Sequence, residues 1–237
     1  MEEFNKEIDN LLEVFKMNIR KSSIISQLRK EHIEPVFLGE LAIELKSIQE
    51  SQGVENIARS QSVVVLVTSF EAFAKDLFRL MINRDDLLKK ALRQCQDIKL
   101  KSGDLLEILN NRTSWGELMI DKNNLSFQNL HSICSALKML GVEFEDILET
   151  TLVDLNNVIT KESKGKITMA IRGKELFSQL LEMRHMIVHE SKVYAVNEID
   201  LNNYLIFLQL LVHQLCNEFR STRLPEAKFL FQKIDFA

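Results

Sequence analysis

The chain has 237 residues, of which 46% are hydrophobic and 27% are charged, and its formal net charge is −4. This length and apolar content are enough to bury a core, which argues against a disordered chain. The slight negative charge argues against a protein that attracts nucleic acid over its whole surface, so any such attraction has to come from a local basic segment.

Turn-forming residues are scarce, with seven glycines and two prolines. A sheet-rich protein of this length needs more of them, so we expect an all-α chain that folds as one large domain or as two small subdomains packed together. The acidic start lacks the features of a secretory signal, the apolar stretches are too short to cross a bilayer, and the three cysteines lie far apart. We therefore expect a cytoplasmic protein without a disulfide framework, a metal or a cofactor.

The hydrophobic pattern predicts three helices at the start of the chain. Apolar residues at intervals of three and four begin at Phe4 and predict a long helix to about Lys30, and a second helix follows over 36–49. The third, over 55–82, contains the run Val63 to Val67, whose composition is typical of a strand. Because this run continues without a breaker into Phe-Glu-Ala-Phe-Ala-Lys-Asp-Leu-Phe, we interpret it as helix.

The middle block, over 84–160, is expected to hold four shorter helices and to be an insertion or a small subdomain. Ser102 is in position to cap the helix that ends at Leu109, and Trp115 is expected in a turn. The two remaining helices are predicted over 125–140 and 144–159.

A basic segment follows over 161–174, with five cations and the single acid Glu162. It leads into the next helix, which makes it a candidate RNA-binding surface, although a solvated loop and helix start is an equally simple interpretation. The candidate RNA-binding residues are Lys164, Lys166, Arg172 and Lys174.

The last two long helices are predicted over 167–189 and 198–220, and the first of them carries the residues most suggestive of chemistry. In the segment Glu-Met-Arg-His-Met-Ile-Val-His-Glu they are Arg184, His185 and His189. An arginine is permanently cationic and can fork onto phosphate oxygens, whereas histidine can give and take a proton near neutral pH. Metal-free cleavage of an RNA phosphodiester requires these groups together.

Arg184 and His189 match the R-x4-6-H signature of the HEPN superfamily, in which a polar residue typically follows the arginine, as His185 does here. The Phe-Glu helix upstream and the apolar helix from Tyr204 to Phe219 resemble the corresponding helices of the RiboL-PSP and MAE branches of that superfamily. Ser191 departs from one pattern, because HEPN proteins that pair with nucleotidyltransferase antitoxins usually carry a tyrosine at that place.

The resemblance implies one multi-helix bundle domain with long antiparallel helices over residues 1–237. It also implies a homodimer with the active cleft at its interface, and endonucleolytic cleavage of RNA without a metal. His189 would be the general base or the general acid, and Arg184 would stabilise charge on the phosphate. His185 would orient groups or hydrogen-bond, with Glu71 and Lys75 as supporting members of the cleft. DNA lacks the 2′-hydroxyl and should not be cut.

The implied partners are RNA, a second copy of the chain, and an antitoxin or another defence-system protein. The resemblance favours the toxic effector of a bacterial antiviral defence or toxin–antitoxin system. A HEPN protein that binds RNA or assembles with partners without catalysis is the alternative function.

Helix geometry sets a condition on this site. Five residues on an ideal helix rotate by roughly 140° and rise by roughly 7.5 Å, so Arg184 and His189 would not share one face. Either the helix ends or loosens near His189, as Ser191 and Lys192 allow, or a twofold dimer brings the pairs of two chains together.

Other interpretations of these residues stay open. Arg184 could be a surface cation, and His189 a C-terminal histidine favoured by the helix dipole. His185 and His189 are four residues apart and could ligate a metal with Glu190 nearby, although no third ligand is evident and the spacing is not H-E-x-x-H. The isolated histidines, interpreted as structural, are His32, His131 and His213.

Overall fold

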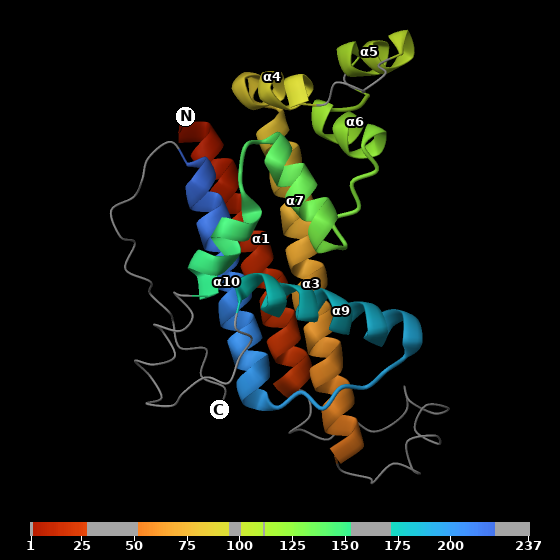
Figure 1. The fold of residues 1–237 in the computed structure, drawn as a ribbon, viewed down its shortest axis with the longest axis vertical. Coiled ribbons are helices and arrows are strands. Elements are labelled where there is room, and N and C mark those ends of the chain that lie inside the picture. The colour runs from red at the N-terminus through yellow and green to blue at the C-terminus, as the bar shows by residue number, and fades with distance from the viewer. Residues whose placement is uncertain (1, 28–51, 95–100, 111, 153–171, 221–237) are drawn as a thin grey trace.

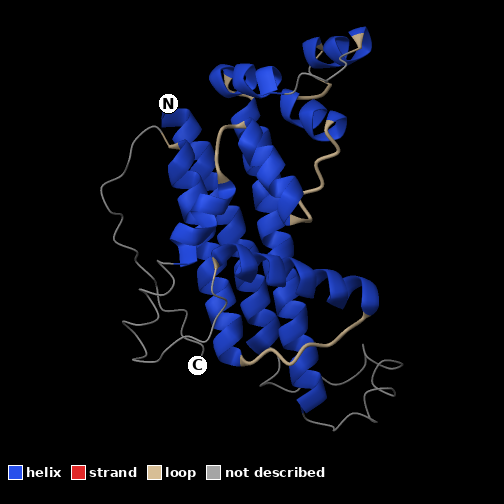
Figure 2. Ribbon diagram, viewed as in Figure 1, coloured by secondary structure: helices blue, strands red, loops and turns tan. Residues whose placement is uncertain are grey.

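The structure, a computed structural model, describes residues 2–27, 52–94, 101–110, 112–152 and 172–220. The regular elements of these ranges are helices, and no strand occurs in them (Figure 2), which confirms the all-α class. No helix within the described ranges combines the length and the apolar composition that a membrane crossing requires.

Three long helices form the body of the bundle: α1 (Glu2–Gln27), α3 (Gln52–Ile82) and α10 (Glu198–Phe219). Each packs against the other two, and α9 (Gly173–Glu190) lies across α3 (Figure 1). The shorter helices lie toward the C-terminal end of α3, where α6 and α7 also contact it. They are α4 (Asp85–Gln94), α5 (Ser102–Leu109), α6 (Trp115–Lys122) and α7 (Leu130–Met139).

The central helix is α3, which packs against α1, α9 and α10. Its Phe70 meets Phe177 of α9 edge-on, with ring centroids 5.1 Å apart, and lies 6.4 Å from the ring of Phe144. Because other helices cover α3 on several sides, its apolar residues are not confined to one stripe. This explains why the run Val63 to Val67 has the composition of a strand and is helical all the same.

The predicted boundaries of α1, α3 and α10 agree closely with the structure, whereas α9 begins later than predicted. The prediction placed its start at 167, but Arg172 has an extended backbone with φ −134° and ψ 145°, so the helix begins at Gly173. The residues over 153–171 lie outside the described ranges.

Two predictions in the middle block are wrong. Trp115 does not lie in a turn but begins α6, because the hydroxyl of Ser114 accepts a hydrogen bond from the N–H of Glu117 at 3.1 Å and caps the helix. Ser102 is the first residue of α5 rather than its cap. Lys101 occupies the cap position, and its N–H donates to the Asp104 carboxylate at 2.8 Å.

The helix predicted over 125–140 is also shorter than expected. Phe127 has a φ of 55°, which a right-handed helix does not contain. The side chain of Asn129 then accepts from the N–H of Ser132 at 2.8 Å, so α7 starts only at Leu130.

The last helix of the block is present over 144–152, and the rest of its predicted range lies outside the described residues. The same holds for the helix predicted over 36–49 and for the candidates Lys164 and Lys166. Buried side chains of the block belong to the same core cluster as those of α3 and α10. Its assignment as an insertion or subdomain stays a prediction.

Candidate functional site

The helix α9 presents two different faces along the segment that carries the candidate residues. Its inner face is apolar, packs against α3, and includes the buried residues Leu180 and Ile187. Arg184 lies toward this inner face, whereas His185 and His189 are exposed. Within one chain, Arg184 is therefore mostly covered by protein, whereas both histidines face solvent.

Arg184 pairs with Glu71 of α3. Its Nη2 atom lies 3.5 Å from Oε2 of Glu71, and the two side chains are only 14% and 9% exposed. This contact is longer than a good charge-assisted hydrogen bond. Glu71 Oε1 and Arg184 Nε are buried and have no hydrogen-bond partner among the described residues. The pair therefore restrains the guanidinium without using its full hydrogen-bonding capacity.

The electrostatics of this pair follow from its burial. Burial raises the pKa of Glu71, and the positive charge of Arg184 acts against that rise. The arginine is thus the group that favours the ionised form of Glu71. Lys75, one turn further along α3, is partly buried and forms no ion pair with another described residue. The structure brings Arg184 and Glu71 together but does not add Lys75 to their pair.

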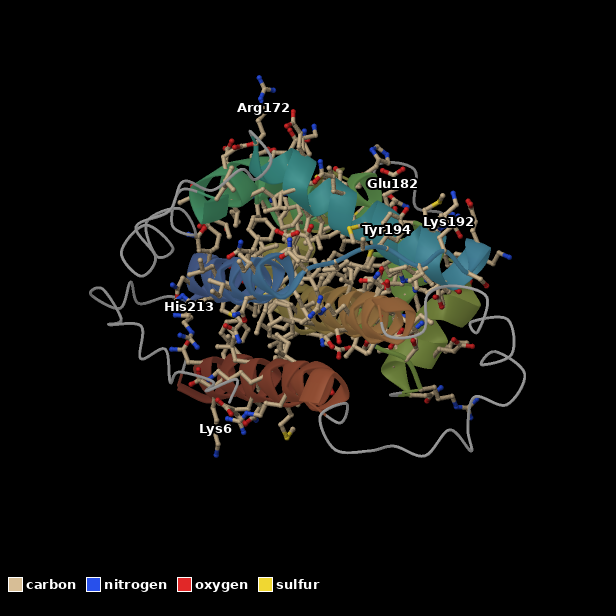
Figure 3. The ribbon with its side chains drawn as sticks, turned by 90° about the horizontal axis from the view of Figure 1, so that it is seen from below. Lys6, Arg172, Glu182, Lys192, Tyr194 and His213 are labelled. Atoms are coloured by element: carbon tan, nitrogen blue, oxygen red, sulfur yellow. The ribbon has the colours of Figure 1, made fainter. Side chains whose placement is uncertain are left out.

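His185 and His189 lie against each other on the outer face of α9. Their ring centroids are 4.7 Å apart and their planes are inclined by 45°. Both side chains are exposed, and the exposed Glu182 precedes them on the same helix (Figure 3). A ligand from solvent can reach either imidazole without a change in the fold.

The helix stays regular past His189 and ends at Glu190. Ser191 then takes the left-handed conformation, with φ 51° and ψ 29°, and the N–H of Lys192 donates to the carbonyl of Met186 at 3.3 Å. Because Arg184 and His189 both lie inside the helix, the offset of roughly 140° between them holds in one chain. Local loosening of the helix does not bring them together, and the dimer stays a prediction.

The segment after the helix, over 191–197, is tied to α3 by residues that the sequence did not single out. The hydroxyl of Ser60 accepts from the N–H of Tyr194 at 3.0 Å and donates to its carbonyl at 3.3 Å. Arg59 Nη1 donates to the carbonyl of Val196 at 3.3 Å. These bonds fix the chain directly after the histidines. The sequence contains a sign of this role, because Arg59 and Ser60 are polar residues just ahead of the apolar run Val63 to Val67.

Two of the candidate RNA-binding residues, Arg172 and Lys174, lie at the other end of α9, and Figure 3 labels Arg172 there. Arg172 is exposed and forms no ion pair with a described residue, whereas Lys174 pairs with Glu145 at 2.6 Å. At 1.5 Å per residue, Arg172 lies about 18 Å along the axis from Arg184. A single phosphate cannot contact both ends of α9, but an extended strand of RNA can.

The start of α9 is docked closely on the helix over 144–152. The N–H of Gly173 donates to Oε2 of Glu149 at 3.2 Å, which places a carboxylate at the positive end of the helix dipole. A Cβ atom on Gly173 would lie 2.1 Å from the carbonyl oxygen of Leu148. Glycine is therefore required here by the close approach of two backbones.

Clusters that suit a polydentate metal site do not occur in the described part of the chain. No group of three or more His, Cys, Asp or Glu side chains there is arranged to hold an ion. Cys216 is buried, and burial raises the pKa of its thiol to about 12, which makes it a poor nucleophile and metal ligand. Cys134 is partly buried, and its pKa is raised for the same reason.

The model of the family described as RiboL-PSP-HEPN matches residues 38–221, a range that includes α3, α9, α10 and the middle block. No curated protein and no solved structure matches the chain.

Proposed function

The chain belongs to the RiboL-PSP-HEPN family, and on this premise we propose that it is an RNA endonuclease that cuts without a metal ion. Membership indicates a ribonuclease or an RNA-binding module. The endonuclease is the finer proposal, and it depends on the residues near the C-terminal end of α9.

The observation that carries the proposal is an exposed imidazole and a restrained guanidinium on the same stretch of helix. His189 is exposed in the last turn of α9, where a phosphodiester can approach it. Arg184 is restrained by Glu71, which limits the conformations of its side chain. Phosphodiester cleavage benefits from a preorganised cation together with an accessible general base or acid.

In the proposed reaction the 2′-oxygen of a ribose attacks the adjacent phosphorus, and the bond from phosphorus to the 5′-oxygen breaks. His189 takes the proton of the 2′-hydroxyl while water protonates the leaving 5′-oxygen, or it gives a proton to the leaving 5′-oxygen while water accepts that of the 2′-hydroxyl. Arg184 stabilises the charge on the pentavalent phosphate, and His185 orients the reacting groups. The products are a 2′,3′-cyclic phosphate and a 5′-hydroxyl, and DNA is not cut because it lacks the attacking group.

A homodimer completes the site in this proposal, because Arg184 faces α3 and His189 faces solvent in one chain. Twofold symmetry would place each His189 near the arginine of the other chain. A mixture of Arg184→Lys and His189→Ala chains should then recover about a quarter of the wild-type rate, since half of the dimers carry one intact site. A mixture as inactive as its components would exclude a site shared in this way.

RNA binding in this proposal extends along α9 to the exposed Arg172, with Lys174, Lys164 and Lys166 as further contacts. We propose the biological role of toxic effector in a bacterial defence or toxin–antitoxin system. An enzyme that cuts cellular RNA has to be restrained, so an antitoxin or another partner protein belongs to the proposal.

The second candidate function is a HEPN module that binds RNA or assembles with partners without catalysis. The low exposure of Arg184, at 14%, favours it, because a guanidinium directed at Glu71 is less available to a phosphate. Growth arrest on expression of the wild type, relieved by His189→Ala, favours the endonuclease. Equal toxicity of both chains, or none in either, favours the module without catalysis.

The experiment that tests the endonuclease is incubation of the purified chain with total RNA in excess EDTA, followed by mapping of the new ends. New 2′,3′-cyclic phosphate ends would support the proposal and identify the target. Intact RNA, or cleavage that appears only when a divalent ion is supplied, would overturn it.

A further inference from the structure

The outer face of α9 carries an arrangement that acid–base catalysis alone does not require. His185 and His189 lie one helical turn apart, with ring centroids 4.7 Å apart and both side chains exposed. Residues at this spacing are neighbours on the helix surface, and each imidazole can turn one nitrogen toward a common point. We propose that the two imidazoles bind one divalent transition-metal ion of the Ni²⁺, Zn²⁺ and Cu²⁺ class.

The charges around this imidazole pair favour a cation. The pair lies toward the C-terminal end of α9, where the helix dipole stabilises positive charge. Glu182 adds an exposed carboxylate before the imidazoles, whereas Glu190 after them is already paired with Lys192 at 2.9 Å. The cation next to His185 in the sequence, Arg184, is directed toward Glu71.

The donor set selects the kind of ion. Imidazole nitrogen suits Ni²⁺, Zn²⁺ and Cu²⁺, whereas Mg²⁺ and Ca²⁺ prefer oxygen ligands. Two protein ligands leave the other coordination positions to water or to a further ligand, as in open metal sites. The described thiols are weak competitors, because burial raises the pKa of both Cys134 and Cys216 and disfavours the thiolate.

A bound ion would act as an inhibitor, a consequence that rests on the proposed function. A metal ion on His189 occupies the nitrogen lone pair that a general base needs to accept a proton. Transition-metal ions should therefore suppress RNA cleavage, and EDTA should restore it. This behaviour is the reverse of that expected from a metal-dependent nuclease.

The test is equilibrium dialysis of the untagged full-length chain against Ni²⁺ alone, with Mg²⁺ as the comparison ion. Replacement of His185 or His189 by glutamine should weaken Ni²⁺ binding by roughly tenfold or more, because one of two protein ligands is lost. The matched control is His131→Gln, since His131 is an exposed histidine on α7 and should not contribute. Ni²⁺ should also raise the thermal midpoint of the wild type and leave that of His185→Gln unchanged.

Equal Ni²⁺ binding by the wild type and His185→Gln, or an equal loss in His131→Gln, would overturn the proposal. The dialysis does not depend on activity, so a failure of the metal-site proposal can be distinguished from a failure of the endonuclease proposal. Ni²⁺ binding to a chain that cuts no RNA would support the metal site and refute the endonuclease. RNA cleavage by a chain that fails the dialysis test would refute the metal site alone.

Discussion

Arg184 of α9 lies 3.5 Å from Glu71 of α3, and both side chains are largely buried. This contact joins the helix that carries the candidate histidines to the central helix of the bundle. The position of Arg184, the arginine proposed to stabilise charge on the phosphate, therefore depends on a carboxylate of another helix. Changes at Glu71 should therefore affect stability and the site together.

Removal of Arg184 should be costly for stability. Arg184→Met should lower the free energy of unfolding by about 3 kcal/mol, because it leaves the buried carboxyl group of Glu71 without its partner. The double variant with Glu71→Gln should recover most of this loss, since no charge is then buried alone. Urea unfolding measures both values.

A matched control for this cycle lies close by on the surface. Lys192→Met removes an exposed pair with Glu190 and should leave the free energy of unfolding nearly unchanged, because solvent screens the two charges. If the double variant were as unstable as Arg184→Met alone, the loss of stability would not come from the unpaired carboxyl group of Glu71.

Glu71 should make the folded chain less stable as the pH rises, which is the opposite of the effect of a carboxylate whose pKa is lowered by folding. Burial raises the pKa of Glu71, so the folded chain holds this proton more tightly than the unfolded chain does. The contribution to stability is fully present below about pH 4 and is lost as the pH rises through the raised pKa. Relative to Glu71→Gln, the wild type should therefore lose stability as the pH rises from about 4. Urea unfolding over a pH series measures the difference, and a wild type that gains stability relative to the variant would contradict the account.

Arg172 should contribute more to RNA affinity than Lys174, whose charge is already paired with Glu145. In a His189→Ala background, Arg172→Ala should weaken binding and reduce the slope of log K against log salt by roughly 0.7 to 0.9. Lys174→Ala should change both quantities less. Fluorescence anisotropy at several salt concentrations gives the two slopes, and the opposite ranking would remove Arg172 from the proposed RNA surface.

Two glycines should respond to alanine in opposite directions. Gly173→Ala should destabilise the chain by about 1 to 3 kcal/mol, because the new Cβ would lie 2.1 Å from the backbone oxygen of Leu148. Gly103 of α5 has nothing within 4 Å of its Cβ position, so Gly103→Ala should stabilise by about 0.5 to 1 kcal/mol. Thermal unfolding of both variants compares them, and a stabilised Gly173→Ala chain would show that α9 is not docked so closely.

Hydrophobic periodicity was sufficient to predict the long helices, because their apolar residues recur at the helical interval over many turns. Short helices depend on single capping groups, and there the sequence was ambiguous. Ser102 and Ser114 are the same residue type ahead of similar segments, but only Ser114 acts as the cap. Trp115 was consequently placed in a turn when it begins a helix.

The environment of Arg184 could not be predicted from its position in the motif. Which side of a helix another element covers is a tertiary property, and the same arginine would suit a solvent-exposed phosphate site equally well. Glu71 was associated with the cleft through its helix, and the structure places it directly against Arg184. Ser60 was missed because its role is to bind the backbone of Tyr194, which lies far along the chain.

The decisive experiment for the endonuclease proposal compares cleavage of a defined RNA in excess EDTA by the wild type and by His189→Ala. The account predicts that the wild type cuts and leaves a 2′,3′-cyclic phosphate, and that a 2′-deoxy substitution at the cut position blocks the reaction. His189→Ala should reduce the rate by about 100-fold or more, while the thermal midpoint stays unchanged because the side chain is exposed. His131→Ala, the control, should cut at the wild-type rate. An undiminished rate in His189→Ala, or no cleavage by the wild type until a divalent ion is added, would contradict the account.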